Sequence, residues 1–169
     1  MANVKFMNPF VEAASEVLKA EVGTEVRRGT LSLQKSAMTT DDITVLISLV
    51  GQVQGVVLYG LSKETGLSLV SRITDQEFTE FDSLAQSGVA ELGNVITGRA
   101  TIKLAESGYG SNISPPTLIQ GRGLQISTLD FSRIMVPLIT DYGEILVHLA
   151  LREAPPGVST DRNFVPISI

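Results

Sequence analysis

Apolar residues recur at helical spacing in three parts of the chain. Between Asn8 and Gly23 they lie three and four positions apart, which predicts a first helix. Asn8 should cap this helix, and Pro9 suits the first helical position because its missing N–H is not needed there. Gly23 should end the helix. The same spacing predicts a second helix over residues 63–73 and a long third helix over about 81–107.

Runs of β-branched and apolar residues predict strands in the remaining segments. Two pairs of such runs flank short turns that contain glycine, which is typical of β-hairpins. Pro137 cannot donate a ladder hydrogen bond, so it predicts an edge position or a bulge in its strand. The hairpins should join residues 42–50 to 54–61 and 134–140 to 144–152, with further strands within 24–38, 117–119 and 124–129 and a loop over 109–116. This order of elements predicts an α+β fold with helices packed on a largely antiparallel sheet.

The long third helix has two different faces. Its apolar residues should form a buried arc: Phe81, Leu84, Ala85, Leu92, Val95, Ile96 and Ala100. Ser87, Glu91, Asn94 and Gly98 cluster on a narrow stripe that lies roughly 130° from the centre of this arc at 3.6 residues per turn. Small residues beside the stripe would let a partner approach closely: Gly88, Ala90, Gly93 and Gly98. The stripe is therefore expected on a different side of the helix from the core.

The composition narrows the chemistry that is available. A net charge of −5, an isoelectric point near 4.9 and scattered basic residues argue against a nucleic-acid partner. The absence of cysteine excludes disulfides and thiol catalysis, and the single histidine excludes a multi-histidine metal site within one chain. His148, on the polar side of the last predicted strand, should lie at the surface or in an interface. No apolar segment has the length of a membrane span and none resembles a signal peptide, so a soluble cytoplasmic protein without a membrane partner is expected.

The spacing of four residues is the most specific feature of the chain. Glu91 follows Ser87 by four positions, Asn94 follows Glu91 by three, and Pro116 comes after 21 intervening residues. This pattern resembles the signature of the CheC/CheX-type chemotaxis phosphatases, which dephosphorylate a CheY-like response regulator. The motif itself covers residues 87–116, while the order of predicted elements is similar to the family over most of the chain.

The resemblance implies a pseudo-twofold internal arrangement with one phosphatase helix in each half of the chain. In the first predicted helix, Glu12 is followed by Ser15 where the amide would stand, and no proline follows at the matching distance. One functional motif is therefore expected, as in CheX-like rather than two-site CheC-like proteins. The resemblance also implies a homodimer that joins the sheets of two copies through an edge strand.

Each motif residue has an expected role. Asn94 should orient the attacking water, because an amide can accept one hydrogen bond and donate another without carrying charge. Glu91 should dock against a lysine or other cation of the regulator. Ser87 would support Glu91 or the interface, Gly98 would contact the partner, and Pro116 would shape a loop. The family places Mg²⁺ in the regulator, so no metal or other cofactor of the protein's own is expected.

Two other functions remain open from the sequence. A non-catalytic module that binds a receiver domain or the flagellar switch would keep the helix without the turnover. An unrelated structural domain would leave Glu91 and Asn94 solvated and without a phosphorylated partner. The folded part is expected to be a single domain over residues 1–153, followed by an extended, proline-containing tail over 154–169.

Overall fold

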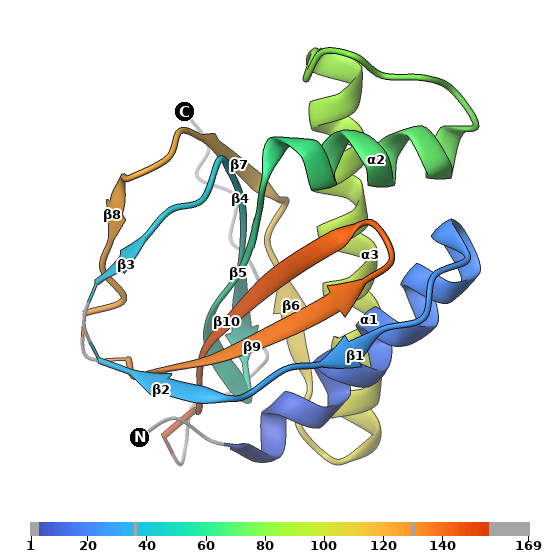
Figure 1. The fold of residues 1–169 in the computed structure, drawn as a ribbon. Coiled ribbons are helices and arrows are strands. Elements are labelled where there is room, and N and C mark those ends of the chain that lie inside the picture. Colours follow the sequence, from blue (N-terminus) through green and yellow to red (C-terminus); the bar gives the residue numbers. More distant parts are fainter. Residues whose placement is uncertain (1–3, 36, 130, 156–169) are drawn as a thin grey trace, which may run out of the picture.

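The computed structural model describes residues 4–35, 37–129 and 131–155. Within these ranges the chain forms the α+β fold shown in Figure 1. The helices are the 3-10 helix η1 (Val4–Phe6) and the α-helices α1 (Met7–Val22), α2 (Lys63–Thr74) and α3 (Ser83–Glu106). The strands are β1 (Arg27–Arg28), β2 (Ser32–Gln34), β3 (Met38–Thr39), β4 (Ile43–Gly51), β5 (Val53–Leu61), β6 (Ser111–Ile113), β7 (Thr117–Gln120), β8 (Gln125–Ile126), β9 (Arg133–Thr140) and β10 (Gly143–Glu153).

The main sheet is antiparallel and is built around two hairpins. Its strand order is β1-β9-β10-β5-β4-β6, with β2 also pairing with β9 and β7 with β4. Both predicted hairpins, β4 with β5 and β9 with β10, are confirmed. They meet through β5 and β10, which pair from Ile145 opposite Leu61 to Glu153 opposite Val53. The two predicted hairpins thus form the centre of the sheet.

The α-helices lie on one face of this sheet and cover its apolar side (Figure 1). α1 and α2 both pack against α3. Because side chains alternate along a strand, Val45, Tyr59 and Val147 on neighbouring strands all point towards the helices. Fully burying one large apolar side chain stabilises a fold by about 1.5–3 kcal/mol, so this core fixes α3 firmly on the sheet. The core includes Phe10, Val17, Leu18, Ile43, Ile47, Val57, Leu69, Ile96, Leu104, Leu138 and Leu149.

Each half of the chain contributes a helix followed by a central hairpin. α1 precedes β4 and β5, and α3 precedes β9 and β10. The two helices pack against each other, and the two hairpins pair side by side (Figure 1). This arrangement agrees with the predicted pseudo-twofold repeat of helix and hairpin.

The start of α1 differs from the prediction. Asn8 does not cap the helix, because η1 runs directly into α1 at Met7 and Phe6 occupies the cap position without a side-chain hydrogen bond. Pro9 still lies in the first turn, where a helix has no partner for its N–H groups. Gly23 ends the helix in the left-handed conformation (φ 74°), as predicted.

Pro137 explains why the strand predicted within residues 24–38 is divided. β9 is an interior strand, but its neighbour on the side away from β10 consists of β1 and β2 with a gap opposite Pro137. In this gap the Gly29 N–H donates a hydrogen bond to the Pro137 carbonyl (2.8 Å). The N–H and C=O of a strand residue point to the same side, so the missing donor of Pro137 faces the interruption. The expected edge position is wrong, and a broken partner strand takes its place.

The second face of the sheet is buried in part, which corrects the prediction for His148. Only 3% of the His148 surface is exposed, and its register neighbours are Leu58 of β5 and Met135 of β9. The small ribbon of β3 and β8 lies on this side of the sheet, away from the helices (Figure 1). Burial, with a smaller contribution from the positive charge of Arg133, lowers the pKa of His148 to about 4. Alternation along a strand indicates which side chains share a face, but not whether that face is covered.

No helix within residues 4–35, 37–129 and 131–155 is long and apolar enough to cross a membrane. β10 ends at Glu153, where the predicted domain also ends. Most of the predicted tail, residues 156–169, lies outside the described part of the chain.

Candidate functional site

α3 carries the four helical residues of the predicted motif. The helix is 24 residues long and begins at Ser83, two residues later than predicted. Asp82 caps it, with its Oδ1 accepting a hydrogen bond from the Ala85 N–H (2.9 Å). The cap sets where α3 begins, and the buried inner side determines which of its side chains face solvent.

Ser87, Glu91, Asn94 and Gly98 lie along one side of α3, as the motif predicts. Ser87 and Glu91 are exposed, and Asn94 and Gly98 are half-buried. Residues three or four apart on a helix have Cβ atoms about 5–6 Å apart, so Glu91 and Asn94 are direct neighbours. Within the described part of the chain, the side chains of Ser87, Glu91 and Asn94 make no hydrogen bond or ion pair. The carboxylate and the amide are therefore both available to another molecule.

Exposed apolar residues accompany this stripe. Leu84 and Val95 were predicted in the buried arc, but 57% and 37% of their surfaces are exposed. Ile102, one turn beyond Gly98, is 62% exposed. The inner side of α3 is instead formed by Ala85, Val89, Leu92, Gly93, Ile96, Thr97, Ala100 and Leu104. Exposed apolar side chains beside free polar groups favour a protein-docking role for this side of the helix.

Pro116 lies half-buried in the turn between β6 and β7. Both strands pair with β4 and contact α3, so the loop predicted over 109–116 is in part a strand. Ser114 ties the turn to β4: its N–H donates to the Ser48 carbonyl and its Oγ accepts from the Ser48 N–H, both at 2.9 Å. Pro116 thus lies in an anchored turn and offers no polar side chain for chemistry.

Two of the small residues of α3 serve its own packing and not a partner. A Cβ at Gly93 would lie 3.1 Å from Val45 Cγ1 and 3.4 Å from Tyr59 Cδ2. A Cβ at Gly88 would lie 3.1 Å from Val70 Cγ1. A Cβ at Gly98 would meet nothing within 4 Å. Gly88 and Gly93 therefore bring α3 close to its neighbours, and only Gly98 of these three glycines leaves open space.

The matching part of α1 does not present a second free pair. Lys103 of α3 lies 3.7 Å from the Glu12 carboxylate and donates a hydrogen bond to Glu16 (2.8 Å). Arg99 also reaches Glu16 (3.4 Å). The hydrogen bond from Lys103 holds the pKa of the Glu16 carboxyl below its usual value. Ser15 stands where the amide would be, so the structure agrees with one motif per chain.

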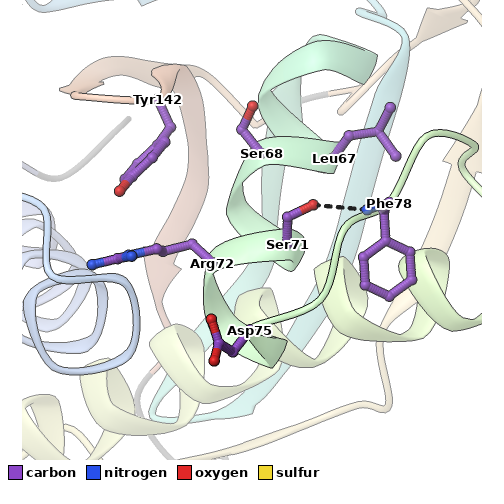
Figure 2. A pocket seen from close by; sticks show the side chains of 7 residues that line it. All are labelled: Leu67, Ser68, Ser71, Arg72, Asp75, Phe78 and Tyr142. Atoms are coloured by element: carbon purple, nitrogen blue, oxygen red, sulfur yellow. Dashed lines mark hydrogen bonds between the residues drawn. The ribbon is translucent and has the colours of Figure 1, made fainter.

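A shallow hollow of about 410 Å³ lies away from the motif, between α2 and the turn that joins β9 to β10. Figure 2 shows Tyr142 of this turn facing the side of α2 that carries Ser68 and Arg72. The Phe78 N–H donates to Ser71 Oγ (3.1 Å) at its border. Its lining is Leu67, Ser68, Ser71, Arg72, Asp75, Phe78 and Tyr142, and none of the motif residues takes part. A convex helix face needs no pocket if the substrate is another protein.

The stripe on α3 offers a carboxylate, an amide and a hydroxyl. Among the described residues, no group of three or more histidine, aspartate or glutamate side chains could hold a metal ion. An amide can orient a water molecule, and a carboxylate can bind a cation of a partner. The arrangement suits chemistry on a group that another molecule presents to α3.

A comparison with protein-family models shows which family the chain belongs to. The model of the family described as chemotaxis phosphatase CheX matches residues 43–138, which include Glu91, Asn94 and Pro116. The chain belongs to the chemotaxis phosphatase CheX family. One relative, the CheY-P phosphatase CheX of Thermotoga maritima, is 29% identical over 127 residues, which cover 75% of this chain and 82% of the relative.

Solved structures of the CheX and CheC-like type share the fold. A CheC-like superfamily protein from Shewanella sp. PV-4 has a TM-score of 0.81 at 26% identity, covering 89% of this chain and 99% of the other. CheX in a CheX–CheY–BeF3–Mg²⁺ complex from Borrelia burgdorferi has a TM-score of 0.75 at 28% identity, covering 89% of this chain and 100% of the other. The α+β architecture predicted from the sequence is thus that of the CheX family.

Proposed function

We propose that this CheX-family protein hydrolyses the aspartyl phosphate of a CheY-like response regulator and that Asn94 and Glu91 carry the activity. The family match over residues 43–138 and the phosphatase from Thermotoga maritima support the reaction. One observation carries the assignment of the site. Glu91 and Asn94 are neighbours on the open side of α3, inside the matched range, without a partner in the described chain.

The reaction needs a positioned water more than it needs a nucleophile from this protein. Water attacks phosphorus in line with the bond to the aspartate oxygen. A new P–O bond forms, the bond between phosphorus and the aspartate oxygen breaks, the aspartate leaves as a carboxylate, and both protons of the water go with the inorganic phosphate. Asn94 Oδ1 would accept a hydrogen bond from the water while Nδ2 donates to a phosphoryl oxygen. Fixing the water removes orientational freedom from the barrier, as the water-orienting glutamine does in small GTPases.

Both a charge pair and apolar contacts would hold the regulator against α3. Glu91 would pair with a lysine or other cation of the regulator, which fixes the register of the two proteins. The exposed side chains of Leu84, Val95 and Ile102 would supply apolar contact area along the same side of α3. Mg²⁺ would come from the regulator, and this protein would add no cofactor of its own. The solved complex from Borrelia burgdorferi contains CheX, CheY, BeF3 and Mg²⁺.

Phosphate release from a phosphorylated receiver domain of the same organism tests the function. In the presence of Mg²⁺, we expect substoichiometric amounts of the protein to accelerate the loss of phosphate over many turnovers. Binding of the phosphorylated receiver without acceleration would favour a non-catalytic adaptor. If no receiver bound and none were dephosphorylated faster, the chain would be a structural domain with the same fold.

The Gly98→Ala variant tests whether a partner approaches α3 closely at this turn, independently of any effect on the stability of the helix. A Cβ at this position meets nothing within 4 Å, and alanine is favoured over glycine in a helix by about 1 kcal/mol, so the variant should be at least as stable in urea. Overpacking a contact costs typically 1–3 kcal/mol, so the KM for the phosphorylated receiver should rise at least roughly fivefold. An unchanged KM would show that the partner does not approach closely at this turn.

We also propose a cytoplasmic homodimer that joins two sheets through an edge strand. Among the described strands, β1 and β2 border one side of the sheet and β6 and β7 the other, with lengths of two to four residues. Such borders present backbone groups that a second copy could pair with. Sedimentation at micromolar concentration would give a dimer, whereas a monomer under these conditions would contradict the proposal.

A further inference from the structure

A buried pair of hydroxyl groups lies beneath the turn of α3 that carries Asn94. Tyr59 of β5 and Thr97 of α3 are 3% and 0% exposed. Their hydroxyl oxygens are 2.7 Å apart, and the Thr97 hydroxyl also donates to the Gly93 carbonyl at 2.7 Å. A hydrogen-bonded chain therefore runs from the sheet to the backbone of α3.

The direction of this chain follows from the number of protons. A threonine hydroxyl has one proton, and Thr97 donates it to the Gly93 carbonyl. Tyr59 must therefore donate to Thr97. Burial raises the pKa of Tyr59 above its usual value, so its proton is retained across the physiological range.

The chain ends at the peptide group that leads directly into Asn94. The Gly93 carbonyl and the Asn94 nitrogen belong to one planar unit, so a hydrogen bond to this carbonyl constrains the orientation of the plane next to Asn94. Gly93 also marks a close approach of α3 to the sheet, since a Cβ there would lie 3.1 Å from Val45 Cγ1. A close steric contact with the sheet and a hydrogen-bonded chain from the sheet therefore both reach this turn of α3.

Packing alone does not require two hydroxyl groups at this place. Replacing both partners of a buried hydrogen bond by apolar groups of similar shape can be nearly neutral for stability. A hydrogen bond differs from apolar contact in being directional, which suits a turn whose outer side must hold an amide in one orientation.

We infer that Tyr59 and Thr97 are positioning residues for Asn94, acting through the Gly93–Asn94 peptide and not by contact with the regulator. The inference rests on the proposed function, because it assigns these residues a part in the same reaction. Their loss should lower the turnover number and leave recognition of the regulator intact.

Tyr59→Phe, Thr97→Val and the double variant test this role in phosphate release from a phosphorylated receiver. A misplacement of about 1 Å can cost on the order of 10²-fold in rate, and we expect each single variant to lower kcat roughly tenfold while KM stays within about twofold. The double variant should be no slower than the slower single variant, because both changes break one chain. Thr97→Ser, which keeps the hydroxyl, should restore most of kcat.

Thr74→Val is the control, on an exposed threonine of α2. The Thr74 hydroxyl donates to the Val70 carbonyl (2.8 Å) in α2, so the variant removes a bond of the same kind that does not reach Asn94. We expect native kcat and KM for this control. Urea unfolding of all variants separates loss of fold from loss of rate. If Thr97→Val does not fold, the Tyr59→Phe variant tests the inference by itself, because Tyr59→Phe removes only one oxygen atom.

The outcomes distinguish this inference from the proposed function. If the native protein does not accelerate phosphate release, the function fails and the inference fails with it. If the native protein is active but Tyr59→Phe and Thr97→Val keep native kcat, only the inference is overturned. It is also overturned if kcat falls as much in Thr74→Val, or if the loss appears in KM instead of kcat.

Discussion

Asn94→Ala should lower kcat for dephosphorylation of the receiver by roughly 10²-fold or more, since even a 1 Å misplacement of a reacting group can cost that much. The alanine variant can no longer orient the water or contact the phosphoryl group. Asn94 makes no hydrogen bond within the described part of the chain, so its removal should leave the free energy of unfolding nearly unchanged. Phosphate release at saturating receiver, together with the affinity for a beryllofluoride-activated receiver, measures both effects.

Two further variants sharpen this experiment. Asn94→Asp keeps the shape of the side chain but replaces the donor by a negative charge beside the phosphate, so kcat should also be low. Asn8→Ala removes an exposed asparagine from α1 and should keep the native rate. Native kcat in Asn94→Ala would contradict the role of the amide, and a loss of affinity without a loss of kcat would make Asn94 a docking residue.

Acid should weaken the fold through His148 well above the pH at which carboxylates usually titrate. The pKa of His148 is lowered from 6.5 to about 4 in the folded protein, so the unfolded chain takes up a proton that the folded chain does not. The corresponding stability is complete above pH 6.5 and is lost as the pH falls towards 4. At 1.36 kcal/mol per pKa unit, we expect the free energy of unfolding to drop by about 2–3 kcal/mol between pH 7 and 4.5. Urea unfolding at a series of pH values measures this slope.

The His148→Gln variant tests whether His148 causes this pH dependence of the free energy of unfolding. Glutamine does not titrate, so the variant should lose most of the pH dependence between 6.5 and 4.5, whatever its stability at pH 7. Asp42 and Glu16 also have lowered pKa values, but from ordinary values of 3.8 and 4.5, so their contribution is lost at lower pH. A His148→Gln variant with the native slope would place the acid sensitivity elsewhere in the protein.

The architecture was largely predictable because its main signals are local. The two hairpins, α2, the extent of α3 and the left-handed end of α1 at Gly23 all follow from periodicity and from residues with restricted backbone angles. Helical geometry also places Glu91 and Asn94 side by side, since neighbours three positions apart need no tertiary contact to share a face. Their catalytic roles remain predictions for the experiments above.

The chain by itself determined the three α-helices, the two long hairpins, the order of helix and hairpin in each half, and the stripe of motif residues on α3. The tertiary structure alone decided which faces are covered. It exposes Leu84 and Val95 beside Glu91, buries His148, and joins Tyr59 to Thr97 across 38 positions of sequence. It also pairs β6 with the edge of β4. The reason is physical: periodicity describes the chain relative to its own axis, whereas burial depends on which distant elements pack against it.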